Sequence, residues 1–204
     1  MISIIIPSIK PCNITLESLG GCPVPYEVII VKKQGLGYAR NYGAKQAKHD
    51  LLVFLDDDLT LKAEVWSHVL GVEHGEFRMT LFSYFPCTRV MAIHKKDYWS
   101  IGGFNSSLQY TEDDDFYVRA LDAGLKFKEI PISLVVHQPH VRRCGNIHAA
   151  ISCVKENRQL LVKYWRRYPA VFGIDFLNRA KRGQIRTLLL QLVFLLYYIC
   201  KGGF

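Results

Sequence analysis

An apolar run that ends in three consecutive aspartates is the feature that most constrains the fold of this chain. The run Leu51–Leu55 leads directly into Asp56, Asp57 and Asp58. Five apolar residues in a row indicate a buried strand, and α/β sheets bind ligands beyond the carboxyl ends of such strands. Because clustered carboxylates repel one another, a fold that gathers them usually recruits a cation or a proton. The triplet therefore predicts a site for Mg²⁺ or Mn²⁺ shared with a phosphate-bearing ligand.

A second acidic cluster, residues 112–115, opens a helical pattern shortly after Gly102 and Gly103. Acidic residues in a first helical turn are also favoured by the helix dipole, so a purely structural role is the alternative for this cluster. A solvated loop that caps the next helix is the alternative for the aspartate triplet. Two clusters, together with His137 at the end of a later apolar run, favour a site over either alternative.

Short β-branched runs alternate with helical patterns along the first 140 residues. This alternation predicts an α/β fold with parallel pairing of strands. The expected strands cover residues 2–6, 27–31, 51–55, 81–85, 89–93 and 132–136, and the expected helices cover residues 38–48, 61–70 and 113–123.

Residues 141–204 differ from the first 140 in charge, carrying twelve basic and two acidic residues, a net charge of +10. Apolar residues recur there at helical spacing, and residues 187–200 are almost wholly apolar. As a helix that segment spans about 21 Å, less than the ~30 Å hydrocarbon core, so we expect amphipathic helices that lie on anionic lipid or form a homodimer. Packing of these helices on the core is the alternative. Because aromatic residues follow helical spacing, nucleic acid is not an expected partner.

The six cysteines form no Cys-x-x-Cys pair, so neither zinc nor a dense disulfide framework is expected. The sequence starts with an apolar run that lacks a basic region before it, which is unlike a signal peptide. Together with the basic C-terminal segment, these patterns predict a peripheral or monotopic protein at the cytoplasmic face of a membrane.

Five motifs in a fixed order resemble the family 2 glycosyltransferases of GT-A fold. They are residues 3–7, 27–31, 39–43, 53–58 and the pair formed by 102–105 with 111–116. The resemblance covers residues 1–140. The chain is similar to membrane-associated lipid-linked sugar transferases such as dolichyl-phosphate mannose synthases. It implies a GT-A catalytic domain at 1–140, with a Rossmann-like, mixed and mostly parallel sheet flanked by helices, followed by membrane-associating helices at 141–204.

The resemblance also implies roles for individual residues. Asp113 matches the general base that deprotonates the acceptor hydroxyl, and Glu112 and Asp115 complete its acidic motif. The matched metal ligands are Asp56, Asp58 and His137, with His140 as the substitute for His137, and the expected ion is Mn²⁺ or Mg²⁺. The matched contacts to the donor nucleotide and sugar are Pro7, Ser8, Arg40, Asn41, Asp56, Asp57, Gly102, Gly103, Arg142 and Arg143.

Three departures from the family pattern bear on specificity. Lys32 and Lys33 follow the second strand, where the family usually has an Asp that holds the nucleobase. Asn105 replaces the Asp usual after Gly-Gly-Phe, and the interval between Asp58 and Gly102 is short. Little chain is left for an acceptor pocket, so we expect the acceptor to arrive from the bilayer.

These observations predict an inverting, metal-dependent transfer of mannose or glucose to a membrane lipid or polyprenyl-phosphate acceptor. GDP-mannose or a UDP-hexose is the expected donor. A sugar-phosphate nucleotidyltransferase is one alternative, although it normally needs a Gly-rich first loop, which residues 7–11 do not provide. A non-catalytic, cation-binding module docked on a membrane by its basic helices is the other.

Overall fold

The computed structural model describes residues 1–9, 13–82, 85–138 and 156. The chain divides into two compact units, one formed by Met1–Phe82 and Pro86–His140, the other by Ser83–Phe85 and Val141–Phe204. Nearly all of the second unit lies outside the described residues, so the C-terminal helices and the domain boundary stay predictions. No helix in the described part of the chain combines the length and the apolar character that crossing a membrane requires.

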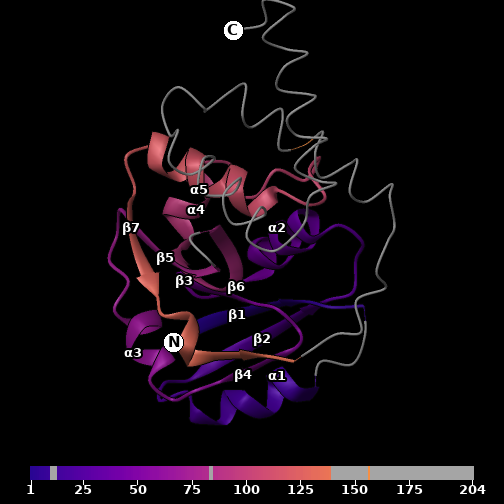
Figure 1. Ribbon diagram of the computed structural model, residues 1–204, viewed down its shortest axis with the longest axis vertical. Coiled ribbons are helices and arrows are strands. Elements are labelled where there is room, and N and C mark those ends of the chain that lie inside the picture. The colour runs from indigo at the N-terminus through magenta and orange to yellow at the C-terminus, as the bar shows by residue number, and fades with distance from the viewer. Residues whose placement is uncertain (10–12, 83–84, 139–155, 157–204) are drawn as a thin grey trace, which may run out of the picture. The chain divides into compact units, whose positions relative to one another are not determined.

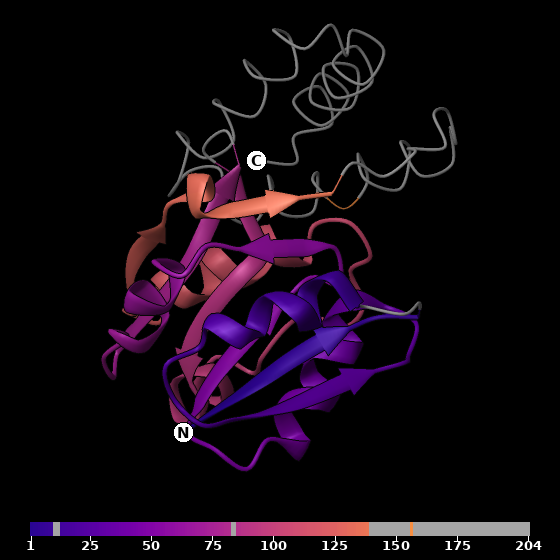
Figure 2. The same cartoon turned by 90° about the horizontal axis from the view of Figure 1, so that it is seen from below.

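The first unit contains two sheets with helices on both faces of the larger one (Figures 1 and 2). The strands are β1 (Ile2–Pro7), β2 (Tyr26–Val31), β3 (Leu51–Leu55), β4 (Leu59–Leu61), β5 (Glu76–Phe82), β6 (Phe85–His94), β7 (Lys126–Ile130) and β8 (Val135–His137). The helices are α1 (Asn13–Ser18), α2 (Leu36–Gln46), α3 (Val65–Leu70), α4 (Lys95–Ser100) and α5 (Glu112–Asp122), with 3-10 turns η1 (Leu19–Gly21) and η2 (Ile132–Leu134).

The larger sheet has the strand order β2-β1-β3-β6-β5-β7, with β1 at the centre of a parallel trio. Strand β6 pairs antiparallel with β3, and β5 pairs parallel with β7. Strands β4 and β8 form a separate antiparallel pair. The predicted class, a mixed and mostly parallel α/β sheet flanked by helices, is confirmed.

Two apolar clusters lie on opposite faces of the sheet, and β3 contributes to both. Leu51, Val53 and Leu55 face the cluster that includes α3 and β4. Leu52 and Phe54 face the cluster that includes α2, α4 and α5, on the side where Figure 1 shows those three helices. All five residues are buried, and burying one such side chain contributes roughly 1.5–3 kcal/mol. This burial on both faces is why the strand reads as an unbroken apolar run.

A glycine brings α2 against the sheet. A Cβ at Gly43 would overlap the Cγ2 atom of Ile5 in β1, so only glycine fits at this contact without displacing the strand. The close approach fixes the position of α2, which carries Arg40 and Asn41.

Several predicted elements differ from the observed ones. The first half of the helix expected at 61–70 is the end of β4 and a turn, and α3 begins only at Val65. The strand expected at 81–85 lies at Glu76–Phe82. Its first half was not predicted because polar residues alternate there with Phe77 and Met79, so the segment lacks a continuous apolar run. The strand expected at 132–136 is mostly the turn η2. Edge strand β7 was missed because only Ile130 of its five residues is buried.

Candidate active site

The loop that follows β3 is anchored by backbone groups on both sides. The Asp56 amide donates to the Arg89 carbonyl at 3.2 Å. The Thr15 hydroxyl donates to the Asp56 carbonyl at 3.0 Å and accepts from the Leu59 amide at 2.9 Å, so one side chain spans the aspartate triplet. A lone threonine in a short helix gives no signal in the sequence, and this role of Thr15 was not predicted.

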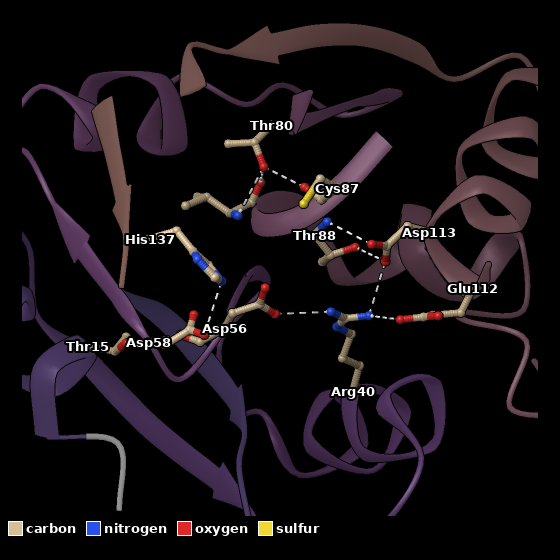
Figure 3. Close-up of polar contacts among 11 residues, drawn as sticks. Thr15, Arg40, Asp56, Asp58, Thr80, Cys87, Thr88, Glu112, Asp113 and His137 are labelled. Atoms are coloured by element: carbon tan, nitrogen blue, oxygen red, sulfur yellow. Dashed lines mark hydrogen bonds and ion pairs between the residues drawn. The ribbon is translucent and has the colours of Figure 1, made fainter. Parts of the chain in front are cut away.

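One buried arginine joins the two acidic clusters (Figure 3). The Arg40 guanidinium donates to Glu112 Oε1 at 2.9 Å, to Asp113 Oδ1 at 3.1 Å and to Asp56 Oδ1 at 3.3 Å. Its side chain is only 2% exposed, and the guanidinium carbon lies 4.9 Å from the centre of the Phe104 ring. The pairing joins the end of β3 to the start of α5, segments that lie far apart in the sequence.

The charge balance at Arg40 shifts the pKa values of its partners. Burial alone would lower the pKa of Arg40, but the charges of Asp113, Asp56 and Glu112 outweigh burial and raise it. Burial raises the pKa of Asp56 to about 7, assisted by the charges of Asp113 and Asp58 and opposed by Arg40. Burial and the charge of Asp113 likewise raise the pKa of Glu112 to about 7. Three carboxylates around one guanidinium leave an excess of negative charge, which favours proton or cation uptake.

Asp58 and His137 form the second polar pair of the site. Asp58 Oδ2 lies 3.1 Å from His137 Nε2. The β4–β8 ladder produces this contact, because Leu59 pairs with His137 in register and the Gln138 amide donates to the Asp58 carbonyl at 2.9 Å. Figure 3 shows the His137 ring pointing toward Asp58, with Asp56 next to Asp58. The expected delivery of His137 by a strand end is therefore observed, although the strand is only three residues long.

Asp113 is held by Thr88 of β6 as well as by Arg40. Its Oδ1 accepts from the Thr88 hydroxyl in addition to Arg40, and its Oδ2 accepts from the Thr88 amide at 3.0 Å. A carboxylate has about four acceptor positions, so donors among the described residues fill three and leave one on Oδ2. The side chain is 23% exposed, so part of it is accessible to a ligand. The contribution of Thr88 was not predicted.

Gly102 and Gly103 form a left-handed turn, with φ values of 80° and 67°. A Cβ at Gly103 would collide with Asn41 Oδ1 and the Tyr98 ring. The Asn41 amide nitrogen donates to the Phe104 carbonyl at 2.7 Å, and its oxygen accepts from the Phe104 amide at 2.9 Å. Asn41 therefore holds the turn in place. Its expected contact with the nucleotide stays a prediction, as does that of Arg40.

The remaining predicted residues take several positions. Ser8, beside Pro7 at the end of β1, donates its hydroxyl to Asp57 Oδ2. Asp115 Oδ2 accepts from Arg119 at 2.7 Å, and Arg119 in turn donates to the Gly103 carbonyl at 2.8 Å. Through Arg119, the acidic motif thus supports the glycine turn.

The expected His140, Arg142 and Arg143 lie outside the described residues. Their predicted contacts with the ion and the donor phosphates stay predictions.

Cys87 lies near the carboxylates but is not a thiolate. Burial raises the pKa of its thiol to about 12, assisted by the charges of Asp113 and Asp56. A thiol with this pKa stays protonated at neutral pH, and the thiolate is the nucleophilic form of cysteine. Cys87 is therefore unsuited to act as a covalent nucleophile.

Part of the chain is similar to a known protein family. Residues 25–72 match the family model for glycosyl transferase family 2. Among curated protein sequences, none matches the chain significantly.

Solved structures resemble the fold at low sequence identity. A mannosyltransferase, PcManGT from Pyrobaculum calidifontis, solved with GDP-Man and Mn²⁺, has a TM-score of 0.65 at 12% identity, over 99% of this chain and 81% of its own. The catalytic domain of Drosophila β1,4-galactosyltransferase 7 with xylobiose has a TM-score of 0.57 at 14% identity, over 72% and 77%. A mutant of that enzyme with manganese, UDP-Gal and xylobiose has a TM-score of 0.55 at 14% identity, over 74% and 78%. These likenesses show the fold.

Fold and family match together define the class of this protein, which is a nucleotide-sugar-dependent glycosyltransferase of GT-A fold. The match to the glycosyl transferase family 2 model covers residues 25–72, which include β2, α2 and the aspartate triplet.

The raised pKa of Glu112 predicts a pH-dependent stability of the metal-free protein. Because folding raises this pKa from 4.5 to about 7, the folded state binds more protons than the unfolded state between these values. Stability is then lost as pH rises through this window. We expect the free energy of unfolding, measured with urea in the presence of a chelator, to fall between about pH 5 and about pH 8. This fall should be about 1–3 kcal/mol larger in the wild type than in Glu112→Gln.

Glu76→Gln is the matched control for this measurement. Glu76 is also buried, but hydrogen bonds from Lys128 and Arg78 outweigh its burial and lower its pKa, so it is ionised at both pH values. Glu76→Gln should therefore change the free energy of unfolding by similar amounts at the two pH values. Equal pH dependence in the wild type and Glu112→Gln would contradict the assignment.

Proposed function

We propose that this enzyme transfers a hexose, mannose or glucose, from a nucleoside-diphosphate sugar to a membrane lipid or lipid-linked acceptor, with inversion at the anomeric carbon. The observation that carries the proposal is the convergence of Asp56, Asp58 and Asp113 at the carboxyl end of β3. Structural relatives that hold GDP-Man with Mn²⁺, or UDP-Gal with manganese, support a nucleotide-sugar donor and a divalent ion. The family match favours this reaction over a nucleotidyltransferase or a non-catalytic module.

The donor atoms of Asp58 and His137 fit Mn²⁺ or Mg²⁺. Neighbouring ligands of an octahedral ion with bonds of roughly 2.1 Å lie roughly 3 Å apart, and the two atoms are separated by 3.1 Å. Asp58 and His137 would hold the ion, with Asp56 as the further predicted ligand, and the bound ion would neutralise the charge of the departing diphosphate. Carboxylate oxygens are the ligands that Mg²⁺ prefers, whereas the imidazole favours a transition ion such as Mn²⁺.

Asp113 is the proposed general base. Arg40 and Thr88 fix its carboxylate in one orientation, which leaves an acceptor position on Oδ2 for the acceptor hydroxyl. Oδ2 would take the hydroxyl proton while the hydroxyl oxygen attacks the anomeric carbon and the bond to the diphosphate breaks. With one base and one displacement, the configuration inverts. If the acceptor is a phosphate, which needs no deprotonation at neutral pH, Asp113 would instead position the sugar.

The acceptor part of the proposal depends on the composition of residues 141–204. Their net charge of +10, combined with long apolar stretches, fits a surface of anionic lipid. A membrane acceptor also fits the short interval between Asp58 and Gly102. We place the enzyme at the cytoplasmic face of the membrane, with GDP-mannose as the first donor to test and a UDP-hexose as the second.

Asp58→Asn is expected to remove metal-dependent nucleotide binding, because an amide loses the charge that attracts the ion. Isothermal titration of GDP and UDP with Mn²⁺ measures this change. Asp122→Asn, which removes the same charge from an exposed position at the far end of α5, is the control and should bind like the wild type. Unchanged nucleotide affinity in Asp58→Asn would show the metal assignment to be wrong.

Asp113→Asn is expected to leave donor binding unchanged and to lower kcat for a hydroxyl acceptor by about 10²- to 10⁴-fold, the usual contribution of a general base. Asparagine retains one carbonyl oxygen for Arg40 but cannot take up the proton. Donor affinity by titration and turnover with radiolabelled sugar separate the two effects. Full turnover in this variant would favour the phosphate acceptor, for which no base is needed.

Deletion of residues 185–204 is expected to release the protein from liposomes that contain anionic lipid. Binding of the intact chain should weaken as salt rises, because salt screens the attraction between basic residues and anionic headgroups. Co-sedimentation with anionic and with neutral liposomes measures both effects. Persistent sedimentation of the shortened chain would rule out membrane binding through this segment.

A further inference from the structure

A cluster of two histidines and one aspartate lies at the opposite end of β3 from the active site. Asp50 directly precedes β3, His94 ends β6 and pairs with Leu51 in the ladder, and His74 lies in the loop between α3 and β5. One ligand atom from each of the three side chains lies within 4.8 Å of the others. The five residues of β3 separate this cluster from the aspartate triplet by roughly 17 Å. We propose that Asp50, His74 and His94 form a second metal site, which binds Zn²⁺ independently of the sugar-transfer site.

The hydrogen bonds of His94 determine which ring nitrogen can bind a metal. Its Nε2 lies 3.1 Å from the Val72 carbonyl, which only accepts hydrogen bonds, so Nε2 carries a proton and donates it. In the neutral ring, Nδ1 then has a lone pair, and it lies 2.6 Å from Asp50 Oδ2. Two lone pairs do not face each other at this distance without a cation between them. A proton or a metal ion therefore lies between Asp50 and His94.

His74 brings a second imidazole to the same carboxylate. Its Nε2 lies 3.7 Å from Asp50 Oδ2, and its Nδ1 lies 3.5 Å from Asp97 Oδ2. The Asp97 oxygen is itself fixed, since it accepts from the Gly75 amide at 2.9 Å. The rings of His74 and His94 stack with their centres 3.9 Å apart, so binding of both to one ion requires the exposed His74 ring to turn.

Each histidine thus has an outer partner on the side away from Asp50. Histidines that bind metal almost always donate their second N–H to a carboxylate or a backbone carbonyl, which fixes the tautomer. The Val72 carbonyl takes this position for His94, and Asp97 is an ion-pair partner of His74 at 3.5 Å, on the ring nitrogen that does not face Asp50.

The ligand types select zinc over the hard ions expected at the active site. Two imidazole nitrogens and one carboxylate oxygen suit Zn²⁺, whereas Mg²⁺ and Ca²⁺ prefer oxygen ligands. Tetrahedral ligands at roughly 2.05 Å lie roughly 3.3 Å from one another, so Asp50 must move away from His94 when the ion binds. Asp50 and His74 are 55% and 64% exposed and can adjust, whereas His94, at 16%, is held by its surroundings. A water molecule would complete the coordination.

An ion at this site would connect three segments that are distant in the sequence: the start of β3, the loop before β5 and the end of β6. Because the three ligands meet only in the folded chain, the ion would stabilise the folded state. Cysteine spacing gives no indication of the site, since its ligands are histidine and aspartate.

Titration of the full chain with Co²⁺ and Zn²⁺ tests the proposal. Co²⁺ in a tetrahedral site with nitrogen ligands absorbs visible light, which gives a readout besides activity. We expect Co²⁺ to produce this absorption and Zn²⁺ to displace it. His74→Ala and Asp50→Asn should each abolish the absorption, and Asp97→Asn should weaken Zn²⁺ binding by about 10- to 100-fold, as loss of an outer partner does.

Two controls separate this site from other metal-binding residues. Asp58→Asn removes the proposed ion at the transfer site and should leave the Co²⁺ absorption intact. His68→Ala removes a histidine of α3 that is not part of the cluster and should also leave it intact. His74 and Asp50 are chosen because both are exposed, so loss of their surface ion pairs should lower the melting temperature without metal only slightly.

Absence of the absorption in the wild type would overturn the proposal. So would full Co²⁺ binding in His74→Ala and Asp50→Asn, or loss of binding in Asp58→Asn or His68→Ala alone.

Discussion

The charge of one buried guanidinium determines how the site of this enzyme is built. Arg40 bonds to Asp56, Glu112 and Asp113, and without it these three carboxylates would repel one another in a poorly hydrated space. A buried ion pair adds little net stability, because desolvation offsets much of the attraction, but removal of one partner leaves an unpaired charge that costs about 3–5 kcal/mol. Arg40 therefore acts mainly by fixing which carboxylates face one another.

The excess of negative charge around Arg40 suits a site that binds a cation and a phosphate-bearing ligand. Raised pKa values at Asp56 and Glu112 reflect burial first and this excess of negative charge second, and such shifts are characteristic of functional sites. A rigid arrangement of charges stabilises a reacting ligand more than mobile groups do, because no reorganisation is needed during the reaction. Thr15 and Thr88 supply this rigidity, the first at the aspartate loop and the second at Asp113.

The two ends of β3 illustrate how one strand can organise two different kinds of site. Its carboxyl end presents oxygen ligands within a charged, partly buried network around Arg40. Its amino end lies beside two stacked histidines at the protein surface. The antiparallel neighbour β6 contributes to both, with Thr88 near one end and His94 at the other. The sheet thus keeps the carboxylate network and the histidine cluster apart. The two sites differ in chemistry because one presents mainly oxygen atoms and the other mainly imidazole nitrogens.

The sequence by itself determined the buried strand β3, the position of the aspartate triplet at its end, helix α5 with its acidic first turn, and the α/β class. Each of these depends on local periodicity, which short segments record directly. Local patterns were less reliable where polar residues alternate with apolar ones, as in β5, or where an edge strand is mostly exposed, as in β7. The order of the motifs also indicated a resemblance to the family 2 glycosyltransferases, and residues 25–72 match that family's model.

Only the tertiary structure decided which side chains meet. The observed partners of Arg40 are Asp56, Glu112 and Asp113, two of them more than seventy residues away in the sequence. The contact between Asp58 and His137 depends on the register of β4 and β8, and the cluster of Asp50, His74 and His94 depends on that of β3 and β6. Sequence shows the type of each side chain and predicts its local conformation. Its long-range partners depend on how the strands pair in the sheet and how the helices pack on that sheet.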